Sequence, residues 1–250
     1  FRGFKKIVIG IGGTGTSDLG LGLCHTFGLR LFNKSGLELK VVPKNYASAT
    51  KIVLPEKTGL SIDVVLDVKI PLYGMNGTTK VFAKQKGAGD KDMLLLEEGA
   101  KNILKILKRD HSISVKDKSF GAGGGLTLGL SLIAGVKVVL SETFLTNQLK
   151  LTKEIRNSDI VITGEGKFDR QSFMNKATGI VLRLVSKHKK NTIMIVGSFH
   201  YNLKSFKTRK PAIYELLPLF NSEKEAIRFF RKGIDLTTKL IANDFLYQPS

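Results

Sequence analysis

The chain has 250 residues, 42% of them hydrophobic, which is enough to bury a sizeable core as one large domain or two lobes. No apolar run approaches the roughly 18 residues that span a membrane, and a single cysteine cannot form an internal disulfide, so we expect a cytoplasmic protein without a membrane partner. The formal net charge of +19 attracts anions, but the basic runs are short and lack interleaved aromatic residues, which favours a solvated surface over a nucleic-acid face.

The first half of the chain is predicted to alternate strands with helices, the pattern of βαβ units and a largely parallel sheet. The helix after the first strand carries one apolar stripe of Leu19, Leu23 and Phe27. A later helix, which Asp90 is placed to cap, has an apolar face over residues 93–107. Strands are expected over residues 7–11, 51–55 and 61–71, with a hairpin over 29–42.

The second half of the chain repeats this alternation. Helices are predicted over residues 145–155 and 177–190, and Ser222 with Glu225 makes a capping box for a last amphipathic helix. Strands are expected over residues 136–142, 158–163, 192–198 and 212–219, of which 158–163 and 192–198 read as buried.

Three glycine-rich loops follow predicted strands, at residues 12–18, 121–125 and 164–172. Ligands of open α/β sheets gather beyond the carboxyl ends of the strands, where backbone N–H groups and helix N-termini bind anions. The third loop adds two acids, Glu165 and Asp169. Such loops in one crevice would suit a nucleotide and an acidic substrate. The alternative is that these glycines have only a structural role, since glycine at a strand-to-helix turn often does no more than permit a positive φ or close packing.

The first loop also contains the dinucleotide fingerprint G-x-G-x-x-G at Gly10, Gly12 and Gly15, with Glu38 at about the distance of a ribose-binding acid. The letters TSD after Gly15 argue against it, because the fingerprint normally continues into a helix of small apolar residues. The sequence has no Walker-type phosphate loop, no serine-nucleophile elbow and no metal-ligand spacing among its histidines. Cys24 is interpreted as a small core residue.

Four segments together resemble motifs of the bacterial-type glycerate kinase family, which phosphorylates D-glycerate with ATP. They are GIGGTGTSDLGLGL (10–23), DVKIPLYGMNGTTKVFAKQKGA (67–88), GAGGGLTLGL (121–130) and SDIVITGEGKFDRQSFMNKATGIV (158–181). The motifs occur in the family's order and with family-like spacing. Leu19, Ile70 and Asn175 depart from the family pattern.

The resemblance implies phosphoryl transfer from ATP to a hydroxyl of glycerate, with Mg²⁺, in an α/β enzyme with parallel-rich sheets and two lobes around a cleft. We place the lobes at residues 1–150 and 151–250. The catalytic residues that it implies are Asp67, Glu165, Asp169 and Lys176, with Asp67 and Asp169 also as metal ligands. The implied cofactor-binding residues are Gly12, Gly13, Thr16, Asp18, Gln85, Lys86, Gly124, Gly125 and Gly164.

The family's N-terminal segment, with an opening strand and an acidic D-G-G-E-G-T motif, has no counterpart in this sequence. We therefore expect an exposed sheet edge unless that segment or a second copy of the chain covers it. The activity of these 250 residues alone is left open. The alternative function is that of a non-catalytic relative that binds anions or nucleic acid.

Overall fold

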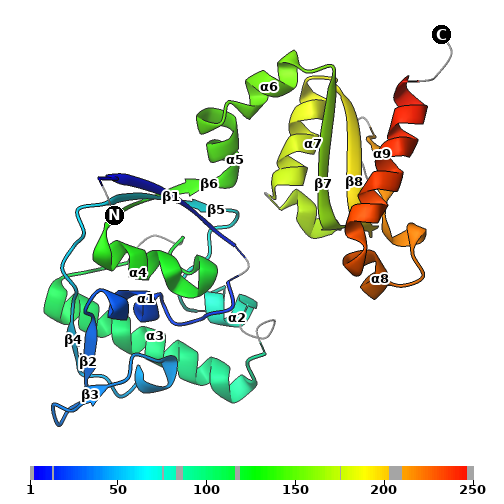
Figure 1. The fold of residues 1–250 in the computed structure, drawn as a ribbon. Helices are drawn as coiled ribbons and strands as arrows, with labels where there is room; N and C mark the ends of the chain where they lie inside the picture. The colour runs from blue at the N-terminus through cyan, green and yellow to red at the C-terminus, as the bar shows by residue number, and fades with distance from the viewer. Residues whose placement is uncertain are drawn as a thin grey trace. The chain divides into compact units, whose positions relative to one another are not determined.

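The computed structural model describes residues 3–12, 14–74, 76–82, 87–115, 119–174, 176–202 and 210–246. The chain divides into two compact units, Phe1–Leu140 and Ser141–Ser250. Each unit has a parallel sheet with flanking helices (Figure 1), so the α/β class predicted from the sequence is confirmed.

The first unit is built on a three-stranded parallel sheet of order β1-β5-β6. In the register pairs Ile9↔Val64 and Ile11↔Leu66, apolar residues of neighbouring strands lie side by side, and Val64 and Leu66 are buried. Aliphatic residues at alternate positions thus make one face of the sheet part of the core. The strands are β1 (Lys6–Ile11), β5 (Ser61–Leu66) and β6 (Gly135–Leu140).

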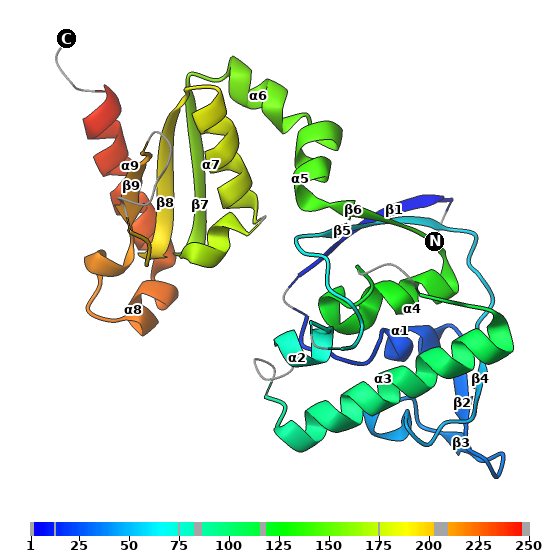
Figure 2. The ribbon, with the colours of Figure 1, turned by 180° about the vertical axis from the view of Figure 1, so that it is seen from behind.

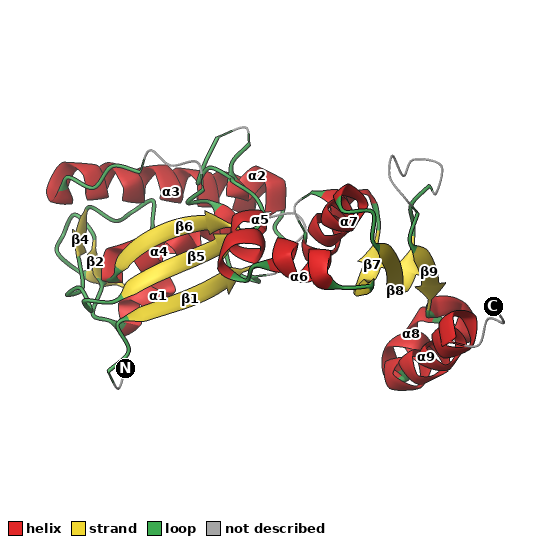
Figure 3. Ribbon diagram, turned by 90° about the horizontal axis from the view of Figure 1, so that it is seen from above, coloured by secondary structure: helices red, strands yellow, loops and turns green. Residues whose placement is uncertain are grey.

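Helices α1, α3 and α4 lie on one face of this sheet (Figures 1 and 3). Helix α3 buries the face predicted for it, which includes Ala100, Ile103 and Leu107, and exposes Lys101 and Lys105. In the part of this unit that the structure describes, no helix lies over the opposite face. The helices are α1 (Leu21–Thr26), α2 (Thr78–Phe82), α3 (Asp90–His111) and α4 (Leu126–Ile133).

A small antiparallel sheet of order β3-β2-β4 lies beside α3 (Figure 2). The predicted hairpin is confirmed, and the side-chain oxygen of Asn33 accepts the backbone N–H of Leu37 in its turn. The side-chain amide of Asn102 on α3 donates to the carbonyl oxygens of Tyr46 and Ala49, at 2.7 and 2.8 Å. The strands are β2 (Arg30–Phe32), β3 (Glu38–Leu39) and β4 (Lys51–Val53).

Several local predictions in this unit are wrong. The strand predicted over residues 61–71 ends five residues early, at Leu66. Helix α1 begins two residues after Leu19, which has a left-handed φ of 59°, so the predicted stripe does not run along one helix. Cys24 does mark the core side of α1, as predicted. The N-cap of α3 is Gly89 and not Asp90, because the N–H of Gly89 donates to the carboxylate of Asp92 at 2.9 Å. Acidic residues are favoured at every position in the first turn of a helix, so the presence of Asp90 does not identify the N-cap residue.

The second unit has a parallel sheet of order β7-β8-β9, with α7 on one face and α9 on the other (Figure 3). Its core contains Leu182 of α7 and Met194 and Val196 of β8. The strands are β7 (Ile160–Phe168), β8 (Asn191–Phe199) and β9 (Ala212–Glu215). The helices are α5 (Ser141–Thr143), α6 (Leu151–Asn157), α7 (Ala177–Lys187), α8 (Glu223–Arg228) and α9 (Phe230–Leu246).

The helix predicted over residues 145–155 is interrupted. A π-helical stretch, Phe144–Gln148, precedes Lys150, whose φ of 54° is left-handed and stops the helix before α6 begins. The strand predicted over 212–219 ends four residues early, at the end of β9. The last amphipathic helix is divided into α8 and α9.

Strand β7 differs most from its prediction. The strand continues to Phe168, so Gly164 and Glu165 lie in the sheet and not in a glycine loop. Ile160 and Ile162 are 41% and 63% exposed, although a buried strand was expected. Among the described residues β7 pairs only with β8, which makes it an edge strand, so these side chains have a strand neighbour on one side only.

Candidate functional site

Two of the predicted glycine loops, residues 12–18 and 121–125, cross each other in the first unit. The backbone N–H of Leu19 donates to the carbonyl oxygen of Gly124 at 2.9 Å. Gly124 has a φ of +69°, and a Cβ there would lie 2.0 Å from the carbonyl oxygen of Thr16. Glycine is therefore required for the two loops to approach this closely.

The second motif reaches the same crossing through its Ile-Pro pair. The N–H of Gly121 donates to the carbonyl oxygen of Ile70 at 2.8 Å, and a Cβ on Gly121 would lie 2.0 Å from the carbonyl oxygen of Pro71. Further along, the N–H of Gly74 donates to the carboxylate of Glu97 at 3.1 Å, which ties this motif to α3. Three of the four motifs thus meet in the first unit.

The crossing leads directly into the N-terminus of α4. Three consecutive glycines, residues 123–125, have positive φ values immediately before this helix. Ser17 in the first loop and Thr127 in the first turn of α4 have buried hydroxyl oxygens with no hydrogen-bond partner among the described residues. The first N–H groups of a helix are unpaired and favour anions. This arrangement suits a phosphate group.

Asp18 has a structural contact at this crossing. Its two carboxylate oxygens accept the N–H groups of Gly20, the N-cap of α1, and of Gly22 in the first turn of that helix, both at 3.1 Å. The hydroxyl of Tyr46 donates to the carbonyl oxygen of Asp18 at 3.0 Å. Burial raises the pKa of Tyr46 far above its usual range and keeps this donor protonated. A contact between Asp18 and a cofactor stays a prediction.

The other predicted residues of this unit are placed less tightly. Gly12, Thr16 and Asp67 are exposed, and Asp67 directly follows β5 at the carboxyl edge of the sheet. This edge is where α/β sheets commonly bind ligands. Gly125 packs against Leu19: a Cβ added to Gly125 would lie 2.7 Å from the Cα of Leu19. Three predicted residues lie outside the described residues: Gly13, Gln85 and Lys86.

Glu165 and Lys176 come together in the second unit. The Nζ of Lys176 lies 3.9 Å from Oε2 of Glu165, whose side chain is 17% exposed. The Oε1 atom of Glu165 is buried and has no hydrogen-bond partner among the described residues. The hydroxyl of Thr178, near the start of α7, donates to the carbonyl oxygen of Gly164 at 3.0 Å. Glu165 therefore offers a buried acceptor to a ligand, beside a cation.

Asp169 caps a 3₁₀ turn that follows β7. Its Oδ1 accepts the N–H of Gln171 at 2.8 Å. The turn lines a hollow of about 720 Å³ that Phe173, His200 and Tyr201 also line. Sequence reasoning missed His200 and Tyr201, because they follow β8 without any motif. Their place beyond the carboxyl end of a parallel strand is the only signal that could have found them.

A magnesium ion in a nucleotide site needs one or two carboxylates together with phosphate oxygens and water. Asp67 in the first unit and Asp169 in the second each place a carboxylate just after a strand, which fits this requirement. The described residues contain no group of three or more His, Cys, Asp or Glu that could hold a metal ion. Metal binding by either aspartate stays a prediction that involves a nucleotide.

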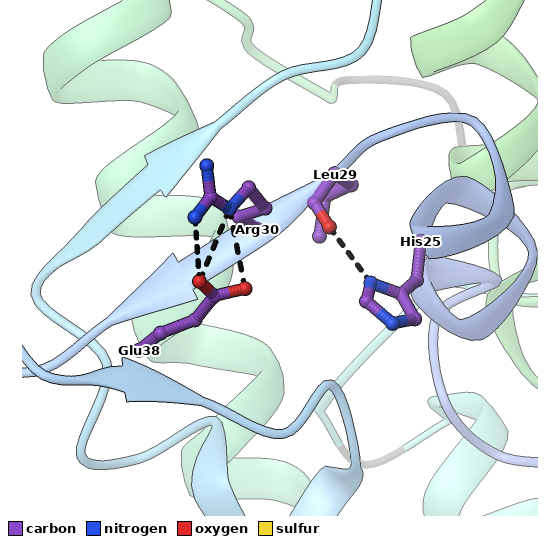
Figure 4. Close-up of polar contacts among 4 residues, drawn as sticks. All are labelled: His25, Leu29, Arg30 and Glu38. Atoms are coloured by element: carbon purple, nitrogen blue, oxygen red, sulfur yellow. Dashed lines mark hydrogen bonds and ion pairs between the residues drawn. The ribbon is translucent and has the colours of Figure 1, made fainter.

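The dinucleotide interpretation of the first loop is weakened by the position of Glu38. Its carboxylate pairs with Arg30 on the neighbouring strand, with Nη2 to Oε2 at 2.7 Å (Figure 4). The hydrogen bonds from Arg30 lower the pKa of Glu38. At the start of the same hairpin, Nδ1 of His25 hydrogen-bonds to the carbonyl oxygen of Leu29 at 3.0 Å. Glu38 is thus engaged within the hairpin and is not held for a ribose.

Known proteins are similar in sequence to most of the chain. The chain is 31% identical over 201 residues to glycerate 2-kinase of Escherichia coli K12, a match that covers 78% of this chain and 53% of that protein. It is 29% identical over 253 residues to glycerate kinase of Bacillus cereus, covering 96% of this chain and 65% of that protein. The chain thus spans about half the length of curated relatives such as the E. coli protein.

A solved structure of a candidate glycerate kinase 2 from Salmonella typhimurium LT2 has the same fold, with a TM-score of 0.64 and 26% identity. That match covers 98% of this chain and 66% of the Salmonella chain. Within the described residues, no helix is long and apolar enough to cross a membrane. A family model described as the glycerate kinase family matches residues 1–246, and the chain belongs to this family.

Proposed function

We propose that this protein acts in the cytoplasm as a glycerate kinase, which transfers a phosphoryl group from ATP to a hydroxyl of D-glycerate with the help of Mg²⁺. The observation that carries the proposal is the crossing of three family motifs at the N-terminus of α4, where Gly121 and Gly124 leave no room for a Cβ. Membership of the glycerate kinase family supports the same activity.

Phosphoryl transfer depends mainly on positioning and on stabilising negative charge. In the first unit, residues 123–125 and the N–H groups that open α4 would hold phosphate oxygens. In the second unit, Glu165 would orient the glycerate hydroxyl and take up its proton, while Lys176 would stabilise developing charge. Asp67 in the first unit and Asp169 in the second are each a candidate carboxylate ligand for Mg²⁺, which when bound neutralises charge on the phosphates.

The test is an ADP-coupled assay of D-glycerate phosphorylation by the 250-residue chain, together with calorimetric binding of Mg·ATP. We expect Glu165→Gln to lower kcat by about 100-fold or more, because general-base groups contribute on this scale. The control is Glu142→Gln, an exposed acid paired with Arg183 in the same unit, which should change turnover about two-fold or less.

A wild-type chain that neither binds Mg·ATP nor phosphorylates glycerate would contradict the proposal. So would a Glu165→Gln variant with the turnover of the wild type. A titration with duplex DNA at two salt concentrations separates the alternative function. Tight binding that falls steeply with salt would indicate a nucleic-acid-binding protein.

A further inference from the structure

A polar hollow of about 600 Å³ is formed in the second unit by the π-helical stretch Phe144–Gln148 and by α6, and we call it the α6 hollow. Its volume lies in the range of ligand pockets, about 300–1,000 Å³. Half of its lining residues are cations, and among the described residues no carboxylate and no aromatic side chain lines it. The lining residues are Thr146, Lys150, Thr152, Lys153, Arg156 and Asn157.

The two faces of α6 explain why its cations point into the hollow. Leu151 and Ile155 are one helical turn apart, and Ile155 is buried. Lys153 and Arg156 are three residues apart and therefore share the other face of the helix. Burial of Ile155 thus fixes the cationic face on the side of the hollow.

The three cations have no counter-charge in the part of the chain that the structure describes. None of Lys150, Lys153 and Arg156 forms a salt bridge there. Glu154, the acid of α6, is not among the residues that line the hollow. Like charges held close together repel each other, and a bound anion turns this repulsion into attraction.

The backbone holds Lys150 in a conformation that is unfavourable for lysine. Its φ of 54° is left-handed, and its carbonyl oxygen accepts the N–H groups of Lys153 and Glu154 at 2.8 and 3.2 Å. Glycine or asparagine would adopt this conformation at a lower cost. Such residues cluster at ligand-binding sites, and π-helical turns are frequent at functional sites. A use for the charge of Lys150 accounts for a lysine at this position.

The α6 hollow is separate from the candidate residues of the second unit. Helix α6 leads into the start of β7 (Figure 1), whereas Asp169 directly follows the end of that strand. The nine residues of β7 make it about 30 Å long at about 3.3 Å per residue. A ligand in the hollow would therefore not occupy the site proposed for glycerate.

We propose that the α6 hollow is a second anion site, which binds a small molecule that carries a diphosphate group. Arg156 would contact one phosphate with its planar guanidinium, and Lys150 and Lys153 would neutralise the other. The hydroxyl of Thr152 and the amide of Asn157 would supply neutral donors. The lack of aromatic lining residues favours a small ligand over single-stranded nucleic acid, which binds by stacking its bases.

The experiment follows amide exchange of the 250-residue chain while inorganic pyrophosphate is titrated without Mg²⁺. We expect exchange of residues 151–157 to slow by about 10-fold or more, and the concentration dependence gives the affinity of this site alone. Lys153→Gln should weaken that affinity by about 10-fold or more, the scale of a hydrogen bond to a charged group. Lys34→Gln removes the same charge from an exposed turn of the first unit and should change the affinity about two-fold or less.

A second titration with ADP distinguishes the two sources of a diphosphate group. Tighter protection of residues 151–157 by ADP would assign the hollow to a nucleotide, and equal protection would assign it to free diphosphate. Protection confined to residues 121–130 would overturn the proposal, because pyrophosphate would then bind only at the glycine crossing. Protection of α6 by duplex RNA but not by pyrophosphate would overturn it as well. No readout uses catalytic activity, so the result is independent of the proposed function.

Discussion

Replacing Gly124 with alanine tests the contact on which the candidate site depends. Gly124 has a φ of +69°, and an added Cβ would lie 2.0 Å from the carbonyl oxygen of Thr16. A left-handed φ costs a residue with a Cβ about 1–2 kcal/mol. Overpacking against the backbone of the first loop costs a further ~1–3 kcal/mol. We therefore expect Gly124→Ala to lower the free energy of unfolding of the first unit by about 2–5 kcal/mol.

Gly36→Ala is the matched control, because Gly36 has a φ of +77° and nothing within 4 Å of its Cβ position. Only the cost of the left-handed φ applies there, about 1–2 kcal/mol. Urea unfolding followed by circular dichroism measures both variants, and calorimetry measures Mg·ATP binding. Gly124→Ala should weaken that binding by about 10-fold or more, because the phosphate donors shift. Equal losses of stability in the two variants would refute the reasoning, since the contact with Thr16 would then contribute nothing.

Three further predictions concern the stability of the two units. Burial, together with the charge of Asp18, raises the pKa of Cys24 from 9.0 to about 12. The stabilisation that the neutral thiol of Cys24 gives to the folded state is therefore complete below pH 9 and is lost between pH 9 and about 12. Urea unfolding at a series of pH values should show this loss of unfolding free energy in the wild type but not in Cys24→Ala. Phe168→Ala should cost the second unit about 3–5 kcal/mol in thermal unfolding, because its buried ring packs against three aromatic rings; an unchanged melting temperature would contradict this. Asn102→Ala should cost about 1–3 kcal/mol by urea unfolding, because carbonyl groups in residues 46–49 lose their donor; faster amide exchange confined to other segments would count against it.

Local patterns along the chain determine much of this fold. The apolar spacing of α3, the turn residues of the β2–β3 hairpin and the alternation of strands and helices each act over a few residues, so the sequence alone predicts them. The four motifs are equally local, and they indicate the family without any knowledge of contacts. Where a local signal is shared by neighbouring positions, as at Asp90 and Asp92, the sequence predicts the element but misplaces its cap.

Contacts between distant segments decided the remainder. The sequence shows that Gly124 and Gly164 lie in glycine-rich motifs, but only the structure places one at a crossing of two loops and the other inside a paired strand. Glu38 has the spacing of a ribose-binding acid, yet Arg30 on the neighbouring strand engages it. Ile162 belongs to an apolar run typical of a buried strand, yet it is exposed because β7 is an edge. An apolar sequence pattern indicates that side chains favour burial. Whether a given side chain is buried depends on neighbours that come from elsewhere in the chain or from another chain.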